Sequence, residues 1–362
     1  MTHAEYLSWL CLKTAPELGP KLALEVLKHY PDPTEFTGKP RHPLYQGEML
    51  TEAATKHLQE NNLPHNTDAI LKLMDHYQIE CLNINEYPVR LKDIFAPPLL
   101  LYFRGNKDCL FKAKNLAVVG TRKSSSYGRA MCSKLLAPLC RQKVNIVSGL
   151  ALGIDTFAHK IALQEGCSTV AVLAGGLDAV YPPQNAELAK QILASGALIS
   201  EYEPGTKSEK WNFPARNRII SALAEVVFVV EGPISSGALL TAKNGIQQDR
   251  EICALPGNIN NINAEGPNHL IKNGAALISS TEDLMNILGM NPEKAEQLEI
   301  PGILSKDEQV IYELLKNEQR ALSFDEILII TKFPIGRLST LMTNLELKGV
   351  IEKEGGNSFF AL

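Results

Sequence analysis

Residues 115–129 read NLAVVGTRKSSSYGR, and this stretch decides the fold that the sequence predicts. The apolar run 116–119 has β-forming residues at its end, which is typical of a strand buried on both faces. Gly120 ends this strand, a polar loop follows, and from Gly128 apolar residues recur every four positions, as in a helix. A parallel strand that turns at a glycine into a helix leaves backbone N–H groups unpaired at the carboxyl edge of its sheet.

The loop of this turn carries two cations, Arg122 and Lys123, together with three serines. Unpaired N–H groups beside cations predict an anion site, above all for phosphate. The dinucleotide-binding pattern GxGxxG is absent, because Arg122 stands where that pattern has its second glycine. The alternative interpretation is an ordinary strand–helix turn whose charges are solvated.

The composition indicates a globular protein of two or three domains, with 362 residues of which 45% are hydrophobic and 21% charged. No apolar run approaches the roughly 18 residues of a membrane span. Glu5 stands where a secretory signal would have basic residues, so we expect no targeting segment and no membrane association. The seven cysteines form no CxxC pair, and the histidines show no HExxH spacing. We therefore expect reduced cysteines in a cytosolic protein, and neither a metal nor another cofactor.

The charge balance limits the classes of nucleic-acid-binding protein that the chain can belong to. The formal net charge is −4, which argues against a protein that covers duplex DNA with a wide basic face. A local basic groove remains compatible with this value, so the distribution of the cations has to decide.

Residues 1–78 are predicted to form a small helical domain of the helix-hairpin-helix or SAM type. A glycine-centred turn at Gly19 and Pro20 separates the first two helical stretches. In a helix-hairpin-helix such a turn exposes N–H groups that can contact a DNA phosphate. Any short helical hairpin needs a glycine there, however, and a structural role is the preferred interpretation.

Residues 79–290 show a different period, with six short apolar runs separated by helix-like stretches. Strands that alternate with helices predict βαβ units, and therefore an α/β fold with a parallel sheet. Five of the six runs end at a glycine, and these ends are expected to meet at the one edge where such sheets bind ligands. Residues 87–102 are expected to be an extended lead-in with a strand of its own.

The C-terminal part begins with a polar linker, predicted for 291–302 because prolines bracket it. After it, residues 303–362 are predicted to contain three helices and a terminal hairpin that turns at 355–357. This order of elements is that of a winged helix. From 301 to the end there are seven Lys and Arg residues against nine Asp and Glu, so we doubt that this domain binds duplex DNA strongly.

A second cationic cluster lies in the stretch 207–223, KSEKWNFPARNRIISAL. Its cations are Lys207, Lys210, Arg216 and Arg218, interleaved with Trp211 and Phe213. Cations bind phosphates and aromatic faces stack on unpaired bases, which together predict a groove for single-stranded nucleic acid. The stretch follows a predicted strand, so it should lie at the same sheet edge as Arg122. The alternative is a solvated basic loop whose aromatic rings fill a gap.

Two further turns could carry chemistry. In the stretch 231–241, EGPISSGALLT, a Gly/Ser turn before a helix again offers N–H groups to an anion. In the stretch 148–159, Asp155 and His159 lie four residues apart on one helix face, where they could form a general acid–base pair. A helix-start cap with a packed histidine is the preferred interpretation of that pair.

Eight motifs in this order closely resemble the DNA processing protein A family (DprA, also called Smf). They read GTRKSSSYG, SGLALGIDTFAH, LAGGLDAVYPPQN, LISEYEPG, FPARNRIISAL, VVEGPISSGALLTA, ALPGNI and GPNHLIKNGA. The resemblance covers the whole central domain and implies an extended Rossmann-like fold that binds single-stranded DNA without cutting it. It also implies a homodimer, and a partnership with the RecA recombinase, which such proteins load onto single strands in natural transformation and homologous recombination.

The resemblance also assigns roles to residues. Arg122 and Lys210 would hold phosphates, and Phe213 would line a base pocket. The whole set implied to bind DNA is Gly120, Thr121, Arg122, Ser125, Tyr127, Gly128, Gly175, Gly176, Lys210, Phe213, Arg216, Asn217, Arg218, Ser236, Gly237 and Thr241. The tail-to-tail dimer seam would include Ile246, Ile271 and Leu277.

The alternative function is that of a nucleotide-processing hydrolase of the phosphoribohydrolase type, whose sheet is related. Those enzymes use a PGGxGTxxE loop in which a glutamate acts on the sugar. Here the equivalent stretch has Thr241 near that position, which removes the acid–base group that the chemistry needs. We therefore expect a protein without a catalytic residue.

Overall fold

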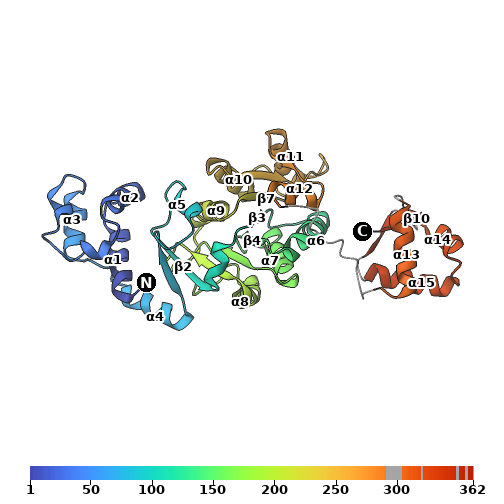
Figure 1. Ribbon diagram of the computed structural model, residues 1–362, viewed down its shortest axis with the longest axis horizontal. Coiled ribbons are helices and arrows are strands. Elements are labelled where there is room, and N and C mark those ends of the chain that lie inside the picture. Colours follow the sequence, from blue (N-terminus) through green and yellow to red (C-terminus); the bar gives the residue numbers. More distant parts are fainter. Residues whose placement is uncertain (291–303, 319–320, 348–349, 355–357, 362) are drawn as a thin grey trace. The chain divides into compact units, whose positions relative to one another are not determined.

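The computed structural model describes residues 1–290, 304–318, 321–347, 350–354 and 358–361 (Figure 1). The predicted linker 291–302 and the predicted hairpin turn 355–357 lie outside the described residues. The chain divides into two compact units, Met1–Pro292 and Glu293–Leu362. None of the helices in the described ranges is long and apolar enough to cross a bilayer.

The first unit begins with a group of helices. They are α1 (His3–Thr14), α2 (Pro20–His29), the short 3₁₀ turns η1 (Pro33–Glu35) and η2 (Pro43–Gln46), α3 (Glu52–Gln59) and α4 (Thr67–Tyr77). Thr2 starts α1 because its hydroxyl and the Glu5 carboxylate form a reciprocal capping box. The buried hydroxyls of Tyr6 and Tyr102 lie 3.1 Å apart and join α1 to the sheet. A continuous core thus crosses the boundary that the sequence placed at residue 78.

A nine-stranded sheet forms the centre of this unit. Its strands are β1 (Glu80–Asn83), β2 (Leu100–Gly105), β3 (Asn115–Val119), β4 (Asn145–Ser148), β5 (Thr169–Val172), β6 (Ala197–Ser200), β7 (Val226–Val229), β8 (Glu251–Ala254) and β9 (Ala276–Leu277). Their order in the sheet is β1-β2-β6-β5-β4-β3-β7-β8-β9. In this spatial order, all neighbouring strands from β6 through β3 to β9 pair in parallel. Strands β1 and β2 extend the sheet by antiparallel pairing, which the sequence pattern did not predict.

The helices of the first unit follow the strands in alternation, as expected. They are α5 (Val89–Lys92), the 3₁₀ turn η3 (Lys107–Phe111), α6 (Ser126–Arg141), α7 (Ile154–Gln164), the 3₁₀ turn η4 (Pro183–Asn185), α8 (Ala186–Ser195), α9 (Asn212–Ala222), α10 (Gly237–Gln247), α11 (Ile262–Lys272) and α12 (Thr281–Ile287). Helices α6, α7 and α8 pack side by side, and α9 packs against α10 (Figure 1). The chain moves across the sheet from β3 to β6, and α9 then leads back to β7 on the other side of β3. Right-handed crossovers therefore put these two groups of helices on opposite faces.

The reversal of strand order beside β3 determines where a ligand can bind. On one side of β3 lies β4 and on the other lies β7, so the loops that follow these strands diverge at their carboxyl ends. In open α/β sheets this switch point forms a crevice, which is the usual ligand position. The stretch 115–129, with which the sequence analysis began, runs through it.

The second unit is a winged helix with a hydrophobic core of its own, which confirms the prediction. Its elements are α13 (Lys306–Asn317), β10 (Leu322–Ser323), α14 (Phe324–Thr331), α15 (Ile335–Leu347), β11 (Ile351–Glu354) and β12 (Ser358–Ala361). Ser305 and Ser323 start α13 and α14 through capping boxes with the glutamates three residues later. The three strands form one antiparallel sheet.

The close approach of β5 and β6 predicts the effect of one substitution on stability. A Cβ atom at Gly196 would lie 2.0 Å from the carbonyl oxygen of Thr169. We expect Gly196→Ala to lower the free energy of unfolding of the first unit by about 1–3 kcal/mol, because backbone must move to relieve the clash. Gly47→Ala is the control, since its nearest atom is 4.0 Å away, and it should change stability by less than about 0.5 kcal/mol. Equal urea midpoints for both variants would contradict this account.

Candidate nucleic-acid interface

The turn after β3 is fixed by contacts with the end of β7. The Thr121 amide donates to the carbonyl oxygen of Glu231, with 2.7 Å between N and O. Gly120 is necessary here, because a Cβ atom would lie 2.5 Å from the Ile154 side chain and 3.0 Å from that same carbonyl oxygen. The backbone of the cationic loop is therefore held in place by its neighbours rather than by its own sequence alone.

The amino end of α6, where we expected an anion, is occupied by the protein's own carboxylate. The buried Glu231 side chain accepts a hydrogen bond from the Ser125 amide at 2.9 Å and a second from the Ser125 hydroxyl. A Cβ atom at Gly128 would lie 2.3 Å from the Glu231 carboxylate, so glycine is required for this approach. A carboxylate of the protein therefore already satisfies this helix end, so the cations of the loop, and not these N–H groups, are the donors left for a phosphate.

A cavity of about 400 Å³ opens at the switch point, between the loops after β3 and β4 and the helices α9 and α10. Nine of the residues that the sequence assigned to the site line it together. These are Gly120, Thr121, Arg122, Phe213, Arg216, Asn217, Ser236, Gly237 and Thr241. Positions more than a hundred residues apart in the chain thus meet, as expected for strand ends at one sheet edge.

Phe213 lies among cations at this cavity. Its ring centroid is 5.3 Å from the guanidinium carbon of Arg122 and 5.9 Å from that of Arg216. Both distances are in the range of a cation–π interaction. The ring of Tyr181, from the loop after β5, lies edge-on to the Phe213 ring, with 5.7 Å between the two ring centroids. An aromatic face flanked by cations suits an unpaired base that is joined to a phosphate.

The inner wall of the cavity carries a buried cation, Arg216. Its guanidinium donates to the carbonyl oxygen of Gly149 at 2.7 Å and to that of Val172, so it joins the ends of β4 and β5. Burial lowers the pKa of Arg216 to about 10, and the Asp155 carboxylate acts in the opposite direction. Arg216 therefore stays charged at neutral pH. Asp155 accepts bonds from the amides of Gly149 and Ala151, and burial raises its pKa.

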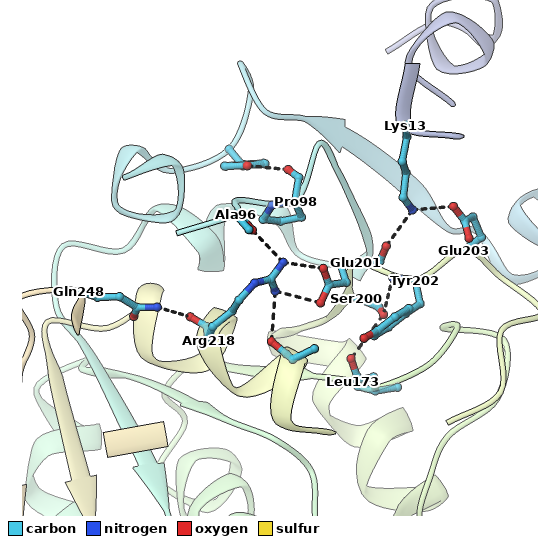
Figure 2. A network of polar contacts seen from close by, with 12 residues as sticks. Lys13, Ala96, Pro98, Leu173, Ser200, Glu201, Tyr202, Glu203, Arg218 and Gln248 are labelled. Atoms are coloured by element: carbon cyan, nitrogen blue, oxygen red, sulfur yellow. Dashed lines mark hydrogen bonds and ion pairs between the residues drawn. The ribbon is translucent and has the colours of Figure 1, made fainter. Parts of the chain in front are cut away.

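Three of the predicted DNA-binding residues have contacts that place them outside the cavity. The guanidinium of Arg218 is paired with the carboxylate of Glu201, with 2.7 Å between N and O, and donates to the carbonyl oxygen of Ala96 at 3.0 Å (Figure 2). This network fixes α9 against the sheet. Gly175 and Gly176 allow the loop after β5 to pack against 203–208, because Cβ atoms there would lie within 3 Å of that segment.

The other predicted residues that do not line this cavity are Ser125, Tyr127, Gly128 and Lys210. Lys210 is exposed in the turn just before α9. Tyr127 is half-exposed, and its hydroxyl donates to the carbonyl oxygen of Pro256 at 2.9 Å. The residues that were predicted to form one DNA-binding site therefore lie in several places at the sheet edge.

The structure adds residues that the sequence analysis did not assign to the site. Asn212 is buried and donates to the carbonyl oxygens of Ala174 and Lys207, which fixes the start of α9. Tyr181 and Glu231 come from the loops after β5 and β7. The rule that loops after parallel strands share one edge could have pointed to both of them.

Asp155 and His159 do not form an acid–base pair. His159 is fully buried, and its Nδ1 lies 2.7 Å from the Thr169 hydroxyl. Burial lowers the pKa of His159 to about 3, so the ring is neutral at physiological pH. The packed histidine of the preferred interpretation is therefore confirmed. The cap is not, because Gly153 is the N-cap of α7 and Asp155 instead accepts from the amides of Gly149 and Ala151 in the loop before it.

The fold and the site define a class of protein: an α/β unit of the extended Rossmann type, with a cationic, aromatic cavity at its switch point, followed by a winged helix. The sequence model of the DNA recombination-mediator protein A family matches residues 78–289, and that of the DprA winged helix domain matches residues 292–357. This chain belongs to the DNA recombination-mediator protein A family.

Relatives of known name support this assignment. Protein Smf of Synechocystis is 32% identical over 98% of both chains, and DNA processing protein DprA of Bacillus subtilis is 37% identical over 78% of this chain and 94% of its own. The X-ray structure of Streptococcus pneumoniae DprA covers 79% of this chain and 98% of its own, with a TM-score of 0.66 and 33% identity. The structure that describes the single-stranded DNA binding mode of Helicobacter pylori DNA processing protein A covers 59% of this chain and 96% of its own, with a TM-score of 0.55 and 30% identity.

The environment of His159 predicts a pH dependence of stability. Its pKa is about 3 in the folded protein and about 6.5 in an unfolded chain. Below pH 6.5 His159 is protonated in the unfolded state but stays neutral in the folded state. As the pH falls, this residue therefore lowers the free energy of unfolding by up to about 1.4 kcal/mol per pH unit. His159→Gln, which cannot titrate, should lose less stability than wild type between pH 6.5 and 5 in urea unfolding. Parallel pH profiles for the two proteins would show that His159 is not the responsible group.

Proposed function

We propose that this protein binds single-stranded DNA without cutting it, and that it delivers the bound strand to a RecA recombinase in natural transformation and homologous recombination. The observation that carries the proposal is the cavity of about 400 Å³ at the switch point, in which the Phe213 ring lies close to the guanidinium groups of both Arg122 and Arg216. A cavity of this kind accepts a base, and the cations hold the adjoining phosphates.

Single-stranded DNA is favoured over duplex because a base has to leave its stack to enter the cavity. In a duplex the bases remain stacked, so only the backbone is available to the protein. The net charge of −4 opposes binding through the backbone alone. The exposed cations next to the cavity, Arg122 and Lys123, are sufficient for local phosphate contacts but not for a wide basic face.

Binding without catalysis is supported by the groups inside the cavity. Among its described lining residues Asp155 is the one carboxylate, and it already accepts two backbone N–H bonds. Thr241 is buried at the position where the related hydrolases need a carboxylate, and its hydroxyl donates within α10 to the carbonyl oxygen of Gly237. A general acid–base mechanism lacks its second group here.

The partners in this proposal follow from the family. The family is described as a recombination mediator, which supports a recombinase as the protein that receives the strand. The Helicobacter pylori relative is described by its single-stranded DNA binding mode, and its structure covers 59% of this chain. Both observations support the transfer of the same two steps, binding and delivery, to this chain.

We also propose a homodimer, through the end of the sheet where β8 and β9 lie. Ile246 on α10 and Leu277 on the edge strand β9 are 59% and 49% exposed, so both large apolar side chains are accessible to a second copy. Ile271 on α11 is half-buried and packs against the core of its own chain. Two exposed apolar residues beside an edge strand favour burial against a second copy.

The winged helix is proposed to contact protein rather than duplex DNA. Residues 301–362 have a net charge of −2, from seven Lys and Arg and nine Asp and Glu. Arg337, near the start of the presumed recognition helix α15, is paired with Asp307 of α13. A helix that reads the major groove needs free cations there.

The cavity assignment predicts different salt dependences for two substitutions. Arg122→Ala should weaken binding of oligo-thymidylate and reduce the slope of log K against log salt by roughly 0.7, because one phosphate contact is lost. Phe213→Ala should weaken binding by about 5- to 150-fold with an unchanged slope, because it removes stacking alone. Fluorescence anisotropy over a salt titration measures both quantities.

Arg141→Ala is the matched control for these variants, since Arg141 is paired with Glu165 and does not line the cavity. It should leave both affinity and slope as in wild type. The proposal fails if folded Arg122→Ala and Phe213→Ala bind oligo-thymidylate as wild type does.

The dimer proposal predicts that Leu277→Glu yields a monomer, because an unpaired charge in an apolar seam is costly. Light scattering over a range of protein concentrations measures this. Val89→Glu is the control, because Val89 is 67% exposed and lies on α5, outside the proposed seam. If Leu277→Glu remains as dimeric as the control, the seam lies elsewhere.

A further inference from the structure

A second cavity, of about 300 Å³, lies at the same sheet edge on the other side of the β7 end. Residues from α6 (Tyr127), from the segments that follow β7 and β8 (Glu231 and Leu255) and from the loop into α11 (Asn258 and Asn261) line it. We call it the Tyr127 cavity, and the one described above the Phe213 cavity. The Phe213 cavity does not account for any of these five residues.

The two cavities are close neighbours. Glu231 lines the Tyr127 cavity and Pro233 lines the Phe213 cavity, so two residues of chain, at most about 7 Å, separate their walls here. The loop between Lys123, which lines the Phe213 cavity, and Tyr127 runs from one to the other. Asn263 donates to the carbonyl oxygen of Lys123 at 3.2 Å and fixes this loop to α11.

The chemistry of the Tyr127 cavity is that of a site for an uncharged ring. The Tyr127 ring is 43% exposed, and its hydroxyl is held by the carbonyl oxygen of Pro256, so the ring is a fixed wall with a free face. Leu255 and Ala264 supply apolar surface. Of the described residues that line this cavity, none is a cation, and Glu231 contributes a carboxylate.

A phosphate is thus excluded by charge, whereas a base can stack on the ring and form hydrogen bonds with Asn258 and Asn261 at the rim. The exposed Lys123 stands in the loop between the cavities, where the phosphate between two bound bases would lie. The Phe213 cavity therefore offers an aromatic ring with cations beside it, and the Tyr127 cavity offers a ring and amides without a cation among its described lining residues.

We propose that the Tyr127 cavity binds a further unpaired base of the same DNA strand, stacked on Tyr127, while the Phe213 cavity holds its neighbour. This proposal rests on the proposed single-strand binding function. It makes Tyr127 a binding residue for DNA through its ring, at a place distinct from the Arg122 and Phe213 contacts.

The test combines protein variants with a short oligo-thymidylate that carries one abasic residue, moved along the strand position by position. Tyr127→Ala should lower the affinity for the intact oligonucleotide by about 5- to 150-fold, the usual effect of one stacked base. When the abasic residue lies at the position that binds in the Tyr127 cavity, Tyr127→Ala and wild type should have nearly the same affinity, because the stacked base is already absent from this oligonucleotide. Tyr127→Phe should restore most of the affinity that Tyr127→Ala loses.

Phe111→Ala is the matched control. Phe111 is 49% exposed, similar to Tyr127, but lies on the 3₁₀ turn η3 and lines neither cavity. It should bind every oligonucleotide as wild type does. Urea unfolding of each variant separates a loss of binding from a loss of fold.

The outcomes distinguish the two proposals. Both proposals hold if the affinity losses from Phe213→Ala and from an abasic residue at one position are not additive, and the losses from Tyr127→Ala and from an abasic residue at a neighbouring position are not additive either. If only Phe213→Ala shows such a position, single-strand binding stands and the second base site is wrong. If neither variant loses affinity, the proposed function falls together with this one. Displacement of the base from the Tyr127 cavity by equimolar free thymidine would indicate a nucleoside site and overturn the strand assignment.

Discussion

The buried guanidinium of Arg216 is the interaction on which the arrangement of the site depends. Its bonds to the carbonyl oxygens of Gly149 and Val172 hold α9 against the carboxyl ends of β4 and β5. A charge that is buried to this degree is stable only with fixed partners. Gly149 cannot be replaced without cost, because a Cβ atom would lie 2.6 Å from the guanidinium. The cation that shapes the cavity is therefore also a structural tie between three elements.

A second buried charge, on Glu231, has the complementary role on the other side of the cationic loop. Its carboxylate closes the amino end of α6 through Ser125 and lines the Tyr127 cavity. The sheet edge is thus divided into a cationic part around Arg216 and Arg122 and a part with a carboxylate and no cation among its described lining residues. Opposite buried charges, on Arg216 of α9 and on Glu231 after β7, give this edge its polarity, and a bound DNA strand would lie with its phosphates toward the cations.

The periodicity of the sequence predicted the elements well, because short apolar runs that end at glycine leave few alternatives to parallel strands. The run 116–119 is strand β3 and Gly120 ends it, as expected. The antiparallel strand β1 was missed, since its four residues carry too little pattern to be separated from the loop around them.

By itself the sequence determined which residue types meet at the sheet edge: Arg122, Phe213 and Arg216 follow strands that parallel pairing brings together, and all three line one cavity. Only the tertiary structure decided which cations are available to a ligand. Arg218 lies two residues from Arg216, yet it is paired with Glu201, which directly follows β6. The same holds at α6, where Glu231 occupies the expected anion position from over a hundred residues away. A count of charges along the chain cannot include such partners, because whether a charge is free depends on the groups that folding brings beside it.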